Sequence, residues 1–233
     1  MVYRQLTDEE FADIQGRILY EDNHLLVFNK RPGEIVQGDK TGDEPLAETL
    51  KAFIARRDSK PGGVFMGIPH RLDRPVSGIV LLAKTSKALE RLGEMFRSGA
   101  VHKTYWALCC QKPEPPEGTL TDLLVRNEKQ NKSYVSKGPG AKEARLRYRY
   151  LRSTERYHLV EVELLTGRHH QIRCQLSHIG CPIKGDLKYG APRSNPDGGI
   201  CLHARRIQFI HPVKKTGVDV TAPVPENWKG VEK

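Results

Sequence analysis

A charged block followed directly by an apolar run, over residues 70–84, constrains the fold more than any other stretch of this sequence. The block places Asp73 between Arg71 and Arg74. The run Ile79–Ala83 is short, rich in strand-forming residues and preceded by a Pro and a Gly, which predicts a buried strand. We therefore expect Asp73 to be held rigidly at the mouth of a sheet. An exposed ion pair is the alternative that this block alone leaves open.

The rest of the chain predicts more strands than helices. Apolar residues at helical spacing predict helices over residues 45–57, 86–98 (with Ser86 as the N-cap) and 169–179. Strand patterns cover residues 18–30, 79–83, 101–110, 120–125, 132–136, 144–151, 157–165, 200–209 and 217–221. The first strand is interrupted by a turn or bulge at residues 21–23, and residues 59–63 form a loop. Because the strands arrive in runs, we predict an α+β fold around a largely antiparallel sheet.

Three arginines recur at every second position within the predicted strand 144–151. They are Arg145, Arg147 and Arg149, and a period of two puts them on one face of the strand. Two interpretations stay open for this face: it is solvated, or it is a stripe that contacts phosphates.

The charge balance favours a polyanionic partner. The 233 residues, enough for one large domain, include 38 Lys and Arg against 28 Asp and Glu, a formal net charge of +10. Nothing resembles a membrane span or a signal peptide, since residues 1–13 are polar and include acidic side chains. The five cysteines form no CxxC pair, so we expect reduced thiols and a cytoplasmic protein.

Five motifs, in this order and spacing, resemble the RluA family of pseudouridine synthases. The five are His70–Gly78, Lys103–Tyr105, Thr166–Arg173, Gly185–Gly190 and Leu202–Pro212. Two departures are visible, since Val76 and His169 stand where many members have Thr. The resemblance covers residues 18–225, nearly the whole chain.

The resemblance implies a single catalytic domain over residues 18–225, built on a large, mostly antiparallel mixed sheet flanked by helices. Residues 1–17 would be an N-terminal extension and residues 226–233 a tail, with no S4-type RNA-binding domain. The implied reaction isomerises uridine in structured RNA, either ribosomal or transfer RNA. It needs no redox cofactor and no metal. We expect a monomer.

The resemblance also implies that Asp73 is the essential carboxylate. Arg168 is the partner predicted for it, in a buried ion pair. A cation at the start of a helix is disfavoured by the helix dipole unless it has an anionic partner, and Arg168 begins the predicted helix. Burial alone would raise the pKa of Asp73, whereas a nearby guanidinium lowers such a pKa by roughly 1–3 units.

Other site residues follow from the same resemblance. Tyr105 would stack on the uracil, Arg71 would fill the gap that the turned-out base leaves, and Ile172 would form part of an apolar wall. RNA contacts are also expected from Arg74, Lys103, Arg173, Arg145, Arg147 and Arg149. Structural hydrogen bonds, rather than catalysis, are expected of His70, Ser77, His170 and His203.

Two other functions, RNA binding without catalysis and metal-dependent nucleic-acid cleavage, compete with this interpretation of the sequence. A non-catalytic RNA-binding protein would be equally basic but has no need of a buried Asp–Arg pair. A metal-dependent nuclease using His70 and Asp73 would need further carboxylates converging on the metal. Arginines beside Asp73 disfavour a bound dication, so the nuclease ranks last.

Overall fold

The computed structural model describes residues 3–38, 42–59, 62–228 and 230–231. Residues 1 and 2 of the predicted extension, 60 and 61 of the predicted loop, and 229, 232 and 233 of the predicted tail lie outside these ranges. The helices are α1 (Asp8–Gly16), α2 (Leu46–Arg57), α3 (Ser86–Ser98), α4 (Gln171–His178) and the 3-10 turn η1 (Leu187–Tyr189). The strands are β1 (Ile18–Glu21), β2 (Leu25–Lys30), β3 (Ser77–Ala83), β4 (His102–Cys109), β5 (Glu117–Asn127), β6 (Lys132–Val135), β7 (Lys142–Ser153), β8 (His158–Leu164), β9 (Leu202–Ile210) and β10 (Gly217–Thr221).

One ten-stranded sheet runs through these elements, in the order β1-β2-β3-β9-β4-β8-β7-β5-β6, with β10 paired to β9. The β3–β9 pair is parallel and the other pairs are antiparallel. The predicted α+β class and mostly antiparallel sheet are therefore confirmed. The parallel contact depends on Gly78, which has a φ of +104° and where a Cβ atom would lie 2.4 Å from the carbonyl oxygen of Ala204.

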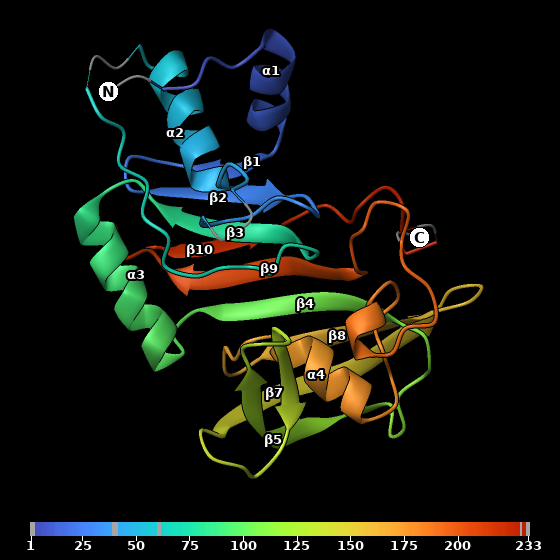
Figure 1. Ribbon diagram of the computed structural model, residues 1–233. Helices are drawn as coiled ribbons and strands as arrows, with labels where there is room; N and C mark the ends of the chain where they lie inside the picture. The colour runs from blue at the N-terminus through green and yellow to red at the C-terminus, as the bar shows by residue number, and fades with distance from the viewer. Residues whose placement is uncertain (1–2, 39–41, 60–61, 229, 232–233) are drawn as a thin grey trace.

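The helices cover the two ends of the sheet (Figure 1). α1 and α2 lie together at the β1–β2 end, α3 flanks β3, and α4 packs against β5 and β6 at the other end. The main hydrophobic core continues from α2 through the centre of the sheet, where Phe28, Phe53 and Leu81 are fully buried. β4 and β9 thus lie at the centre of the fold, with helices on either side of them.

Some local predictions needed correction. The interruption predicted at residues 21–23 is confirmed as a turn, but it divides the strand predicted over 18–30 into the hairpin β1–β2, because Asp22 accepts from the main-chain N–H groups of His24 and Leu25. The N-cap of α3 is Thr85 rather than Ser86, with the Thr85 hydroxyl accepting from the N–H of Ala88.

Both chain ends pack onto the central domain. The predicted extension contains α1, which begins at a reciprocal capping box between Thr7 and Glu10. Ile14 from α1, and Trp228 from the predicted tail, belong to the same hydrophobic core as the sheet. Among the described residues, no helix is both long and apolar enough to cross a membrane.

Candidate active site

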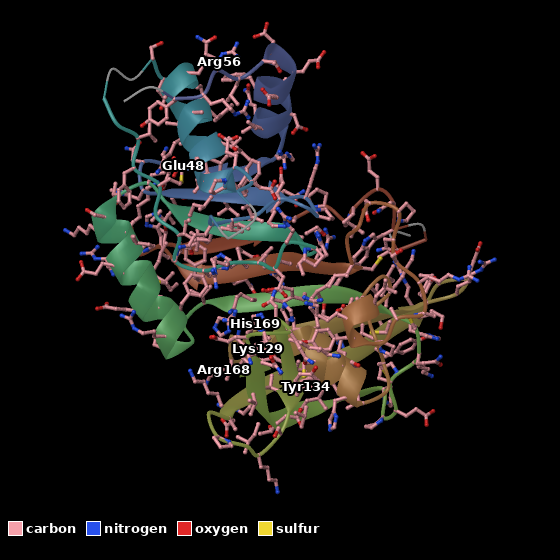
Figure 2. The ribbon with its side chains drawn as sticks, in the orientation of Figure 1. Glu48, Arg56, Lys129, Tyr134, Arg168 and His169 are labelled. Atoms are coloured by element: carbon pink, nitrogen blue, oxygen red, sulfur yellow. The ribbon has the colours of Figure 1, made fainter. Side chains whose placement is uncertain are left out.

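A cavity of about 860 Å³ opens beside the centre of the sheet. Its walls come from the loop before β3, the C-terminal end of α3, the start of β4, and the turn between β8 and α4. In Figure 2, Arg168 and His169 from that turn are labelled between the lower end of α3 and α4. Segments distant in sequence therefore meet here, and Asp73 and Tyr105 both line the cavity.

The loop that carries Asp73 is anchored by main-chain hydrogen bonds. The N–H of Val76 donates to the Asp73 carbonyl at 3.0 Å and closes a turn. Below the turn, the buried Lys30 Nζ donates to the carbonyls of Arg31 (2.8 Å), Arg74 (3.1 Å) and Val76 (2.7 Å). Burial lowers the pKa of Lys30 to about 8. Three carbonyl acceptors satisfy its ammonium donors, so the turn is held from inside the protein.

Arg173, on α4, is the guanidinium partner of Asp73. Its Nη1 lies 3.1 Å from Asp73 Oδ2, while its Nε and Nη2 donate to the two oxygens of Asp186 at 2.7 and 2.9 Å. The side chains of Arg173 and Asp186 are only 5% and 1% exposed. Although burial opposes the charge, hydrogen bonds to Asp186 and Asp73 raise the pKa of Arg173. Two carboxylates thus share one fixed guanidinium, and Asp73 keeps 31% of its side chain open to the cavity.

The prediction that Arg168 pairs with Asp73 is wrong, because Arg173 is the partner. Arg168 is exposed at the rim of the same cavity, and its Nε donates to the carbonyl of Glu143 at 2.7 Å. The physical reason is the position at which α4 begins. The helix starts at Gln171 and not at His169 as predicted. Arg168 therefore precedes the helix, and the helix turns Arg173 toward Asp73. A buried Arg173 also cannot serve as the RNA phosphate contact predicted for it.

The side chain of Gln171 shapes the turn before α4. Its Oε1 accepts from the Thr166 hydroxyl (2.8 Å) and from the N–H of Arg168 (3.0 Å). His170 then adopts a left-handed conformation, with φ 52° and ψ 25°. This conformation is uncommon for residues other than Gly, although His adopts it more often than most. It directs the His170 ring toward Asp73, with Nε2 3.5 Å from Oδ2.

His170 is a neutral neighbour of the carboxylate. Burial, reinforced by the positive charge of Arg173, keeps its pKa far below the usual range. Its Nδ1 is 3.0 Å from the hydroxyl of Tyr189, which also bonds the main chain of Ser133. The hydrogen-bonding role predicted for His170 is thus confirmed, and the prediction missed that this bond lies beside Asp73.

Tyr105 and a group of apolar side chains form the inner wall of the cavity. Tyr105 is 6% exposed, and burial together with the charge of Asp73 raises the pKa of its hydroxyl, so the phenol stays protonated near neutral pH. Ile172, Leu72 and Val76 line the cavity and are buried. This wall offers a flat aromatic ring and an apolar surface to a planar ligand.

Cations surround the opening of the cavity. Arg71 is exposed at the rim, Lys103 is half-buried inside it, and the exposed Arg74 forms an ion pair with Asp43. Arg97 and Arg126, which the sequence did not single out, also line the cavity and are exposed. The rim therefore presents positive charge around the carboxylate of Asp73.

Two of the three stripe arginines, Arg147 and Arg149, lie on the other face of the sheet, away from the cavity. The predicted alternation is confirmed, since Arg145, Arg147 and Arg149 are exposed between buried neighbours. Arg147 pairs with Glu163 at 3.2 Å and Arg149 with Glu161 at 2.9 Å. Residue 105 shares its face with the buried residues 162 and 148, according to the strand register, so these two arginines point away from Tyr105. Arg145 pairs with Glu143 at 3.3 Å and borders the cavity.

His70 and His203 make structural hydrogen bonds, as predicted. His70 Nε2 accepts from the N–H of Leu81 at 2.9 Å, and its ring stacks on Phe96. His203 Nδ1 is 2.9 Å from the hydroxyl of Ser77. The ring nitrogen that a nuclease would use at His70 is thus occupied. Across the described residues, no cluster of three or more His, Cys, Asp or Glu side chains is arranged to hold a metal ion.

Comparison with known proteins identifies the family of this chain. The family model described as RNA pseudouridylate synthase matches residues 24–178, which is more than half of the chain. The chain therefore belongs to the RluA family of pseudouridine synthases and is an RNA pseudouridine synthase. This assignment rules out the competing non-catalytic and nuclease functions as the class of the protein.

Similar proteins cover most of the chain. It is 34% identical over 219 residues to the ribosomal large subunit pseudouridine synthase C of Vibrio cholerae, covering 91% of this chain and 67% of that protein. It is 31% identical over 234 residues to the synthase D of Xylella fastidiosa, covering 95% and 70%. The solved structure of human RNA pseudouridylate synthase domain containing 4 matches with a TM-score of 0.78 at 26% identity, covering 93% of this chain and 92% of that one.

Proposed function

We propose that this protein converts uridine to pseudouridine in large-subunit ribosomal RNA, with Asp73 as its catalytic carboxylate. The relatives named above carry ribosomal large subunit in their names, which supports ribosomal rather than transfer RNA. The observation that carries the catalytic assignment is the cluster of Asp73, Arg173 and Asp186 beside Tyr105. No RNA-binding role calls for a partly open carboxylate held by a buried guanidinium.

The reaction breaks the bond between uracil N1 and ribose C1′, turns the base, and joins C5 to C1′. The C5 proton is lost and N1 gains one, so atoms and electrons balance without a cofactor. Asp73 serves this reaction in either of two ways: by attacking the sugar or base, or by stabilising positive charge at C1′. Both need an ionised carboxylate, and the guanidinium of Arg173, 3.1 Å away, is the cation that contacts it.

The target uridine must leave the RNA stack before it reaches Asp73. Turning it out costs a few kcal/mol, and stacking in the pocket returns about 1–3 kcal/mol per base. In this proposal Tyr105 stacks on the uracil, and Ile172, which lines the same cavity, contributes to its apolar wall. Arg71, exposed at the rim, is placed to occupy the gap in the RNA, since a guanidinium is planar and stacks like a base.

We propose that the enzyme works as a monomer in the cytoplasm. The five cysteines are all free thiols, which fits a reducing compartment. Every part of the cluster around Asp73 comes from one chain, so one copy is enough to build the site.

The test is to incubate purified protein with unmodified transcripts of large-subunit ribosomal RNA and of transfer RNAs, and to map pseudouridine in each. We expect one or a few converted uridines in the ribosomal transcript. Conversion confined to transfer RNA would contradict the proposed substrate while preserving the activity. A complete absence of conversion in every RNA would contradict the proposed function itself.

A further inference from the structure

Lys103 is a cation of the cavity that the proposed mechanism leaves without a role. It lies on β4 two residues before Tyr105, so both side chains project from the same face of the strand, about 7 Å apart along it. Lys103 is half-buried. Its Nζ lies 5.5 Å from the centre of the Phe96 ring, and that ring in turn stacks on His70.

The ammonium of Lys103 has no anionic partner in the described part of the chain. No carboxylate or carbonyl there lies within hydrogen-bonding distance of it, and burial lowers its pKa. The other buried cations of this region differ, since Arg173 contacts two carboxylates and Lys30 three carbonyls. Arg71, at the rim, is exposed to solvent instead.

A half-buried charge without a partner is costly unless a ligand supplies the partner. The neutral carbonyl of a uracil would compensate the ammonium poorly, whereas a phosphodiester carries a full negative charge and strong acceptor oxygens. Gly167 borders the same space, since a Cβ atom there would lie 3.9 Å from Lys103 Nζ. The site for an anion therefore lies between β4 and the turn that precedes α4.

We propose that Lys103 binds the phosphate that flanks the target uridine while its base lies against Tyr105. The proposal rests on the proposed function, because it assigns this anion site to the nucleotide being isomerised. Phe96 fixes the ammonium over its ring, so the phosphate is bound at a defined distance from Tyr105. The contact thus positions the sugar of the turned-out nucleotide beside Asp73.

The proposal is tested by changing the lysine and the phosphate together. Two versions of a short RNA containing the uridine converted in the mapping experiment are synthesised, each with a neutral methylphosphonate at one of the two flanking linkages. Lys103→Met should lower kcat/KM on ordinary RNA by about 10- to 100-fold, in line with a lost charged hydrogen bond. One methylphosphonate should cost the wild type a similar factor but add less than about threefold to the Lys103→Met defect.

Two further variants complete the experiment. Lys103→Arg should retain most of the activity, because it keeps the charge. Lys112→Met is the matched control, since Lys112 Nζ also lies over an aromatic ring, Tyr150, at 4.9 Å, but is exposed outside the cavity. It should leave kcat/KM unchanged on all RNAs.

Stability separates an anion site from a structural role. Removing an unpaired, half-buried ammonium should leave Lys103→Met as stable as the wild type or more stable, whereas loss of a structural contact would lower its melting temperature. Additive losses at both linkages, or a destabilised Lys103→Met, would overturn the proposal. Either result would leave pseudouridine formation by the wild type intact, so it would not bear on the proposed function.

Discussion

The two faces of the central sheet use arginine in opposite ways. On the cavity face, Arg173 is buried and holds two carboxylates, while Arg97 and Arg126 are exposed at the rim. On the opposite face, Arg147 and Arg149 each pair with a glutamate of the neighbouring strand, and all four side chains are at least partly exposed. The pairing and burial of arginines, rather than their number, therefore distinguish the cavity face of the sheet from its opposite, solvated face.

The largest expected difference in the free energy of unfolding and in turnover is between Arg173→Met and Arg149→Met. Loss of Arg173 leaves Asp186 buried without a partner, which should lower the free energy of unfolding by roughly 3–5 kcal/mol and abolish turnover. Loss of Arg149 removes an exposed ion pair, worth about 0–1 kcal/mol. Urea unfolding and single-turnover assays of both variants measure the contrast. Equal destabilisation by the two substitutions would break the comparison.

Asp186→Asn should have the next largest effect. It retains the shape of the Arg173 partner but removes the charge that fixes the guanidinium, so Asp73 loses its orientation. Misplacement of a reacting group by about 1 Å can cost 100-fold, and we expect kcat to fall about 10- to 100-fold while KM changes less than threefold. A variant whose KM rises while kcat is unchanged would show that Asp186 serves RNA binding instead.

RNA affinity should separate the two faces by its salt dependence. Each phosphate contact contributes about 0.7–0.9 to the slope of log affinity against log salt. Substituting Arg97 and Arg126 by Gln should lower that slope by about one to two, whereas substituting Arg147 and Arg149 by Gln should leave it unchanged. Filter binding to the ribosomal transcript between low and moderate salt provides the measurement. A reduced slope in the second pair of variants would restore the phosphate-contacting interpretation of the stripe.

The smallest expected effect is the pH dependence that comes from His70 on the cavity side. Burial lowers its pKa to about 3, from an ordinary value near 6.5, so the unfolded chain takes up a proton at a pH where the folded protein does not. The free energy of unfolding should therefore fall as the pH drops below about 6.5, by up to about 1.4 kcal/mol per pH unit for this one group.

The control for the pH experiment comes from the stripe face. His70→Gln, whose amide oxygen can replace Nε2 as the acceptor for Leu81, should reduce the acid slope of unfolding free energy. His102→Gln should leave the slope unchanged, since His102 is exposed. Equal slopes in the wild type and both variants would exclude His70 as a source of the dependence.

Local patterns predicted much of the fold but not the partner of Asp73. The strand that follows Asp73, and the alternation in β7, follow from apolar periodicity, which depends on neighbouring residues. The capping box at Thr7 and Glu10 was also readable and would have located α1. The Asp73–Arg173 pair could not be predicted from the sequence, because the left-handed conformation of His170 delays the start of α4 to Gln171.

Asp186 and Lys30 show that contacts between residues far apart in the sequence could not be predicted either. Asp186 follows Arg173 by thirteen residues and reaches it across a loop, and Lys30 lies more than forty residues before two of the three carbonyls that it binds. Helical and strand periodicity carry no information on such separations. The motif Gly185–Gly190 was noticed as a resemblance, but the contact that explains its aspartate required coordinates.

The central claim is that Asp73, fixed by Arg173, performs the isomerisation. The most direct measurement is single-turnover conversion of uridine in the ribosomal transcript by wild type and by Asp73→Asn, with binding of the same RNA measured alongside. The account predicts no detectable pseudouridine from Asp73→Asn, with RNA affinity within about tenfold of the wild type because affinity comes mainly from phosphate contacts. Substantial turnover by Asp73→Asn would contradict it.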